Sequence, residues 1–154
     1  MKSNDSFLLN TDVLFETRRE PMHPNVKRFL KETSVNRLFL SPLSLGELRR
    51  QARNSRDIDT QTESHFDNWL DEAKSIFEER LLPIDADVAD IWSIVRNDDI
   101  RSVTASLIAA TAASNNLILV TRTAEDAAGM KVRTLNPWHA AYRTRPAPPT
   151  GDVS

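Results

Sequence analysis

The chain has 154 residues, of which 40% are hydrophobic and 27% are charged, and its formal net charge is −2. This length and composition are typical of a single globular domain with its own core. The absence of cysteine excludes disulfides, thiolate zinc sites and cysteine nucleophiles. No apolar stretch reaches the roughly 20 residues that span a bilayer, and the N-terminus lacks the pattern of a signal peptide. We therefore expect a soluble, cytoplasmic protein that makes no membrane contact.

The first half of the chain is predicted to alternate short strands with helices. Apolar runs predict strands over residues 6–10 and 37–41, and helical spacing predicts a helix over 25–32. Another helix is expected to follow the first strand directly, from Thr11 or Asp12. Ser44 is expected to begin the next helix, because Glu47 three residues later completes the capping-box arrangement.

The second half begins with helices and ends with strands. One helical face is continuous over 63–81, Asp85 is placed to cap a further helix, and residues 103–114 form an alanine-rich helix. Strands are predicted at 117–121, with the sequence LILVT, and at 131–135. The tail, 144–154, is rich in proline and polar residues, so we expect it to be disordered and residues 1–143 to form the domain.

Alternating strands and helices predict an α/β fold in which a central parallel sheet of four or five strands lies between helical layers. Functional groups in such sheets gather beyond the carboxyl ends of the strands. The polar residues expected at this edge are Asn10, Asp12, Glu47, Thr121, Arg122, Glu125 and Asp126. Clustered carboxylates there would suit Mg²⁺, which prefers oxygen ligands.

Three blocks of the sequence resemble the VapC-type, FitB-like PIN-domain toxins of toxin–antitoxin systems. They are LLNTDVLFETRR, LSPLSLGELRR and ASLIAATAASNNLILVTRTAEDAAGMKVRTLNPW, and the resemblance extends from about residue 7 to residue 138. The resemblance implies a three-layer PIN fold and an endoribonuclease that depends on Mg²⁺ or Mn²⁺. It also implies homodimers, a VapB-type antitoxin as partner in a hetero-oligomer, an RNA substrate, and contact with operator DNA only through the antitoxin.

The same resemblance implies four acidic positions that hold the metal ion, and this chain keeps two of them. Glu47 and Asp126 match the family pattern as catalytic and metal-binding acids, whereas Asn10 and Ala105 stand where the family has aspartates. An amide oxygen can bind Mg²⁺ but brings no charge, and alanine brings no ligand. We therefore expect reduced metal affinity and a nuclease that is inactive or weakly active.

Other residues near these positions are candidates for auxiliary roles. These are Thr11, Asp12, Thr121 and Arg122, while Arg49 and Arg50 are candidates for RNA phosphate contacts. If a helix begins at Thr11, we expect Asp12 to turn away from the site and to act as a first-turn helix charge. Asp98 and Asp99 would need a different backbone path to reach it.

Each of these residues also has a structural interpretation. Glu47 can complete a capping box, Asp126 can be a turn residue, and the arginines can be solvated helix ends. At the level of function, the alternative is a non-catalytic PIN-domain module that binds an antitoxin and helps to repress its operon. A receiver-like signalling domain is disfavoured by the LIAATA block and by the missing phosphoacceptor context.

Overall fold

The computed structural model describes residues 4–55, 59–141 and 145–149. Within them a five-stranded sheet has the order β2-β1-β3-β4-β5. The strands are β1 (Phe7–Leu9), β2 (Leu38–Phe39), β3 (Ile118–Val120), β4 (Arg133–Leu135) and β5 (Arg145–Pro146). The first four are parallel to one another, and β5 pairs antiparallel with β4. The predicted α/β fold with a central sheet of four or five strands is confirmed, and the sheet is parallel as predicted except for β5.

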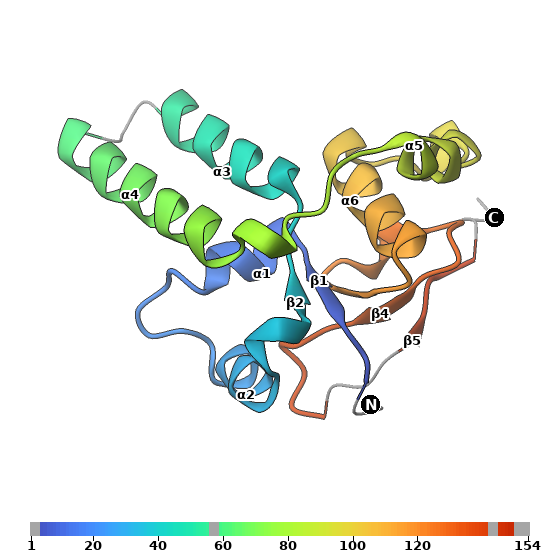
Figure 1. Ribbon diagram of the computed structural model, residues 1–154, viewed down its shortest axis with the longest axis horizontal. Helices are drawn as coiled ribbons and strands as arrows, with labels where there is room; N and C mark the ends of the chain where they lie inside the picture. The colour runs from blue at the N-terminus through green and yellow to red at the C-terminus, as the bar shows by residue number, and fades with distance from the viewer. Residues whose placement is uncertain (1–3, 56–58, 142–144, 150–154) are drawn as a thin grey trace.

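Helices cover both faces of this sheet and give three layers (Figure 1). They are α1 (Thr11–Glu16), α2 (Pro24–Glu32), α3 (Pro42–Asn54), α4 (Thr60–Ile76), α5 (Ala86–Ser93) and α6 (Val103–Ser114). Short 3₁₀ turns lie at Val35–Arg37, Glu78–Arg80, Asn97–Asp99 and Ala124–Ala127. Figure 1 shows α3 and α4 as an antiparallel pair on one side of the molecule, with α5 and α6 on the other.

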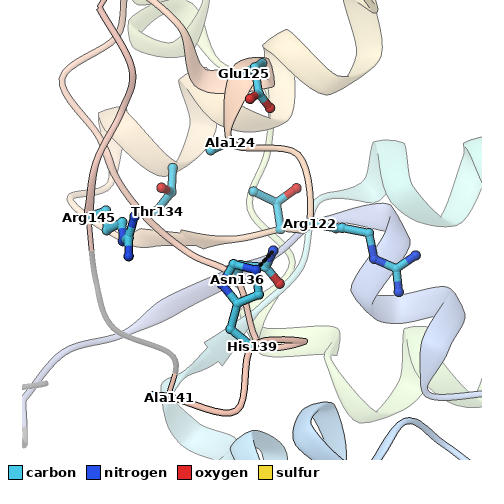
Figure 2. Close-up of a pocket in the computed structure, with 9 residues that line it drawn as sticks. Arg122, Ala124, Glu125, Thr134, Asn136, His139, Ala141 and Arg145 are labelled. Atoms are coloured by element: carbon cyan, nitrogen blue, oxygen red, sulfur yellow. Dashed lines mark hydrogen bonds between the residues drawn. The ribbon is translucent and has the colours of Figure 1, made fainter.

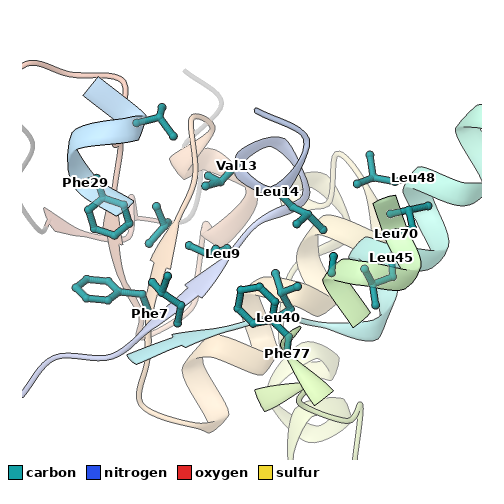
Figure 3. Packing of buried hydrophobic residues seen from close by; sticks show 14 of the residues in the cluster. Phe7, Leu9, Val13, Leu14, Phe29, Leu40, Leu45, Leu48, Leu70 and Phe77 are labelled. Atoms are coloured by element: carbon teal, nitrogen blue, oxygen red, sulfur yellow. The ribbon is translucent and has the colours of Figure 1, made fainter. Parts of the chain in front are cut away.

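The core is divided in two by the sheet because successive side chains of a strand point to opposite faces. Phe7 and Leu9 of β1 enter one cluster, whereas Leu8 between them enters the other. The first cluster packs α1 to α4 against the sheet (Figure 3), and the second packs α5 and α6. These two packed faces fix the carboxyl edge of the strands, where the candidate site lies.

The start of α3 differs from the prediction. Ser41 is the N-cap, its hydroxyl accepts a hydrogen bond from the amide of Leu43 at 3.1 Å, and Pro42 takes the first helical position, which proline favours. Ser44 and Glu47 consequently lie inside the helix, so the predicted capping box is wrong. By contrast, Asp85 caps α5 as predicted, accepting a hydrogen bond from the amide of Val88 at 3.0 Å.

The disordered tail predicted from residue 144 is wrong for residues 145–149. Arg145 pairs with Thr134 across the β4–β5 ladder, and the amide of Ala147 donates to the carbonyl of Val132 at 2.8 Å. Edge-strand hydrogen bonds therefore hold a segment whose composition is too polar for a core. Residue 144 and residues 150–154 lie outside the described residues. None of the helices in the described ranges is long and apolar enough to cross a membrane.

Candidate functional site

A crevice of about 320 Å³ opens at the carboxyl edge of β1 and β3. Its walls come from α1, α3, α6 and the 3₁₀ turn at Ala124–Ala127. We use "the crevice" for the cavity lined by Asn10, Thr11, Asp12, Phe15, Glu47, Leu48, Gln51, Ala105, Thr123 and Asp126. All four positions that the family resemblance singled out therefore line one cavity.

Thr121 connects the two polar residues that follow β1. It is buried, and its hydroxyl accepts a hydrogen bond from the amide nitrogen of Asn10 at 3.0 Å. The same hydroxyl lies 3.5 Å from a carboxylate oxygen of Asp12 and accepts the amide of Thr123 at 3.0 Å. Asn10 is buried as well, with 6% of its surface exposed. The side chain at position 10 is thus held by a fixed hydrogen bond at the base of the crevice.

Asp12 faces the crevice, and the expectation that it turns away is wrong. The helix does begin at Thr11, but side chains in the first turn of a helix tilt back toward its N-terminus. The carboxylate of Asp12 therefore reaches the end of β3, where it accepts the amide of Arg122 at 2.9 Å. Burial raises its pKa, and the hydrogen bonds from the amides of Arg122 and Val13 partly oppose that rise.

Glu47 reaches the crevice from the second turn of α3. One carboxylate oxygen lies 3.3 Å from the hydroxyl of Thr11, which also lies 3.0 Å from the hydroxyl of Ser44. Ser44 itself is fully buried. Thr11 thus connects α1 to α3 across the opening and fixes the direction of the Glu47 side chain.

Asp126 completes the set of acids from the opposite wall. Its pKa is raised by burial first and then by the neighbouring charge of Asp12, with smaller contributions from Glu125 and Glu47, while Arg101 lowers it. The carboxylates of Asp12 and Glu47 are therefore close enough to Asp126 to disfavour its charged form.

The donor set nevertheless does not fit a resident Mg²⁺ ion. Ala105, in the first turn of α6, presents only a methyl group to the crevice. Within the described ranges, no group of three His, Asp or Glu side chains is arranged so that it could hold a metal ion. Two carboxylate oxygens of Asp12 are already taken by backbone amides. The three acids line the cavity without converging on one point, and Asp98 and Asp99 do not line it.

The candidate RNA-binding arginines lie in different environments. Both ends of the Arg49 guanidinium are occupied, by Asp67 at 2.8 Å and Asp71 at 3.0 Å, which joins α3 to α4. Arg50 is exposed on α3. Arg122 lies with its guanidinium 4.0 Å from the centre of the Trp138 ring, a geometry that holds a cation in place.

A second cavity, which the sequence reasoning did not identify, lies on the other side of the segment that follows β3. This flanking pocket has a volume of about 330 Å³ and is lined by Thr121, Arg122, Ala124, Glu125, Thr134, Asn136, His139, Ala141 and Arg145 (Figure 2). The signal available in the sequence was the run NPWH, which brings an amide and an imidazole to the end of the last predicted strand. Arg145 carried no signal, because the tail was expected to be disordered.

The chain belongs to the PIN domain family, whose sequence profile matches residues 8–125. The match runs from within β1 through β3 and covers every residue that lines the crevice except Asp126, which follows directly after it. No curated protein is similar enough to this chain to be counted as a match.

Solved structures point to one group within this family. The chain is similar to the crystal structure of FitAcB from Neisseria gonorrhoeae, with 27% identity, a TM-score of 0.73, and coverage of 86% of this chain and 99% of that chain. It shares its fold with a toxin–antitoxin complex from Klebsiella pneumoniae, at 22% identity and a TM-score of 0.62, covering 87% and 99% of the two chains. It also shares its fold with the DNA-bound VapBC from Salmonella typhimurium, at 22% identity and a TM-score of 0.61, covering 79% of this chain and 89% of that chain. The resemblance to VapC-type PIN toxins is therefore confirmed.

Proposed function

We propose that this chain is the toxin component of a VapBC-type toxin–antitoxin pair, with a nuclease site weakened by two substitutions. The observation that carries the proposal is the crevice, which gathers Asn10, Glu47, Ala105 and Asp126 from the N-cap of α1, the helices α3 and α6, and a turn. These are the positions of the four metal-binding acids that the family resemblance implies. Glu47 and Asp126 are the proposed catalytic and metal-binding acids that remain of this set. With only these two, the site would hold Mg²⁺ or Mn²⁺ poorly and act weakly on an RNA substrate.

Asp12 adds a third carboxylate to this site, in an auxiliary role with Thr11, Thr121 and Arg122. It does not replace Asp at position 10, because its oxygens accept two backbone amides and its pKa is raised by burial. A carboxylate so engaged has less capacity left for a metal ion. With its present sequence, the chain should therefore cleave RNA weakly or not at all.

An apolar groove supports the proposal of an antitoxin partner. It measures about 310 Å³ and is lined by Leu9, Leu14, Thr17, Leu30, Thr33, Val35, Leu38, Trp69, Glu72, Ala73, Ile76 and Phe77. Ile76 and Val35 expose 60% and 48% of their surfaces. Amphipathic peptides bind grooves of this kind with their apolar face. We infer that a segment of a VapB-type antitoxin covers it, and that operator DNA is reached only through that antitoxin.

A non-catalytic binding module is the second candidate, and the poor fit of the crevice to Mg²⁺ favours it. On this hypothesis the chain retains the apolar groove and the antitoxin, and its role is to help repress the operon. The two candidates differ in the chemistry of the crevice alone. Both include homodimers within a hetero-oligomer with the antitoxin.

The groove and the crevice can be tested separately. Ile76→Lys should abolish copurification with the antitoxin encoded beside this chain, whereas Ile84→Lys, an exposed isoleucine outside the groove, should not. Unchanged copurification of Ile76→Lys would contradict the assigned groove. The crevice is tested by adding Mg²⁺ to the purified chain with RNA, because a catalyst must bind the ion and cleave, whereas a binding module need do neither.

A further inference from the structure

We propose that the flanking pocket binds one nucleotide of a single-stranded RNA beside the scissile position, with its phosphate held by Arg145 and its base or sugar against His139. The inference rests on the proposed function, because it assigns the path of the RNA at the same site. It adds a binding surface that the four acidic positions do not supply.

The first argument is the position of the pocket. Residues of the segment after β3 alternate between the two cavities: Thr123 and Asp126 line the crevice, whereas Arg122, Ala124 and Glu125 line the flanking pocket. This segment of chain therefore borders both cavities. A strand whose phosphate lies in the crevice can therefore place a neighbouring nucleotide in the flanking pocket.

The second argument is charge. The crevice repels a phosphate through Asp12, Glu47 and Asp126, so an RNA strand needs cations elsewhere to be held. The flanking pocket supplies Arg122 and Arg145 against a single acid, Glu125. Among the described residues, the Arg145 guanidinium has no hydrogen-bond or ion-pair partner of its own. Phosphate contacts from free arginines contribute most of the affinity for nucleic acid.

The third argument is the arrangement of the polar groups. Figure 2 shows Arg145 beside Thr134 at one side of the pocket, and Asn136 and His139 together at another, with Glu125 at the far end. A ring nitrogen of His139 lies 3.5 Å from the amide nitrogen of Asn136, and the His139 residue is exposed. A volume of about 330 Å³ lies at the small end of ligand pockets, as suits one nucleotide.

Arg122 contributes to this pocket by holding its wall in place. Its side chain extends away from Arg145 in Figure 2 and stacks on Trp138, while its amide donates to Asp12 of the crevice. Arg122 therefore makes one contact beside the flanking pocket, through its side chain, and one in the crevice, through its amide. These two contacts hold the segment between the cavities in place. The distance between the crevice and the flanking pocket is then constant, which a site for two consecutive nucleotides requires.

Binding of a short fluorescein-labelled oligoribonucleotide in EDTA tests the inference without any cleavage. Fluorescence anisotropy should show that Arg145→Gln weakens binding about fivefold, the upper range for an exposed charge contact. The slope of log affinity against log salt should fall by about 0.7, the value for one phosphate on a single strand. His139→Gln should weaken binding with little change of slope, because this side chain is assigned to the base or sugar and not to a phosphate.

Arg53→Gln, an exposed arginine near the far end of α3, is the control with the same loss of charge and should leave affinity and slope unchanged. If Arg145→Gln and His139→Gln both bind the oligoribonucleotide as tightly as the parent and the Arg53→Gln control do, the flanking pocket is not a nucleotide site. Cleavage by a variant with Asp at positions 10 and 105 would then still support the proposed function. Failure of the parent to bind RNA, together with no cleavage by that variant, would overturn both.

Discussion

Restoring carboxylates at positions 10 and 105 should convert the crevice into a metal site. Asn10→Asp combined with Ala105→Asp raises the number of carboxylates in it from three, Asp12, Glu47 and Asp126, to five. At position 10 the new carboxylate lies where the hydroxyl of Thr121, 3.0 Å from the present amide nitrogen, can donate to it. At position 105 it replaces a methyl group on the opposite wall. The ion would then be held from both sides.

The size of the effect follows from the charge of the ion. Two unit charges separated by about 4 Å attract by about 4 kcal/mol at an effective dielectric constant of 20, and a divalent ion doubles this. Desolvation and repulsion among the five carboxylates remove most of the gain. A remainder of about 1.4 kcal/mol for each carboxylate corresponds to tenfold in affinity. The double variant should therefore bind Mg²⁺ about a hundredfold more tightly than the parent, and each single variant much less.

Isothermal titration calorimetry with Mg²⁺ measures this difference directly. A variant with Ala105→Asn and an unchanged Asn10 is the control, because it adds nearly the same volume at position 105 without charge. The metal-free double variant should also unfold at a lower temperature in EDTA than the parent, since its added charges are uncompensated. If the double variant binds Mg²⁺ no more tightly than the parent and is equally stable in EDTA, the assignment of this crevice as a metal site is wrong.

Three further predictions concern the chain as written. Purified parent protein should release few or no RNA fragments in Mg²⁺, and robust cleavage that Glu47→Gln abolishes would show that Asp12 completes the site after all. Because burial raises the pKa of Asp12 and Asp126 above 3.8, the folded chain binds protons more tightly than the unfolded chain. The free energy of unfolding should therefore fall as the pH rises from 3.8 through these raised values. In thermal unfolding, Asp126→Asn should make the stability less dependent on pH over this range. The control Asp90→Asn, at an exposed position of α5, should leave the dependence unchanged. Sedimentation should show homodimers at high micromolar concentration, and a strict monomer, alone and with the antitoxin, would contradict the assembly we propose.

The order of elements could be predicted from the sequence because each carries a local signal. The LILVT run gave β3, and the apolar stripe with Asp85 before it gave α5 and its cap. Local signals were weaker at helix starts. Ser44 with Glu47 fits a capping box as well as Ser41 with Pro42 fits an N-cap, and only the buried position of Ser44 beside Thr11 decides between them.

Part of the candidate site could likewise be predicted from the sequence, and part could not. The order of the motifs was enough to bring Asn10, Glu47, Ala105 and Asp126 to one cavity. The direction of Asp12 was wrong because it depends on the tilt of first-turn side chains and on the free amide of Arg122. The flanking pocket depends on β5, whose hydrogen bonds to β4 join residues far from the crevice in the sequence. Composition favours disorder for that segment, so sequence reasoning did not include Arg145.

Growth of a bacterial host after induction, without the antitoxin, tests the central claim most directly. The parent chain should be harmless or nearly so, and Asn10→Asp with Ala105→Asp should arrest growth, with Glu47→Gln added to the double variant restoring it. Coexpression of the antitoxin should also relieve the arrest. A double variant that is as harmless as the parent, while folded and present at the same level, would contradict the conclusion that this crevice is a weakened nuclease site.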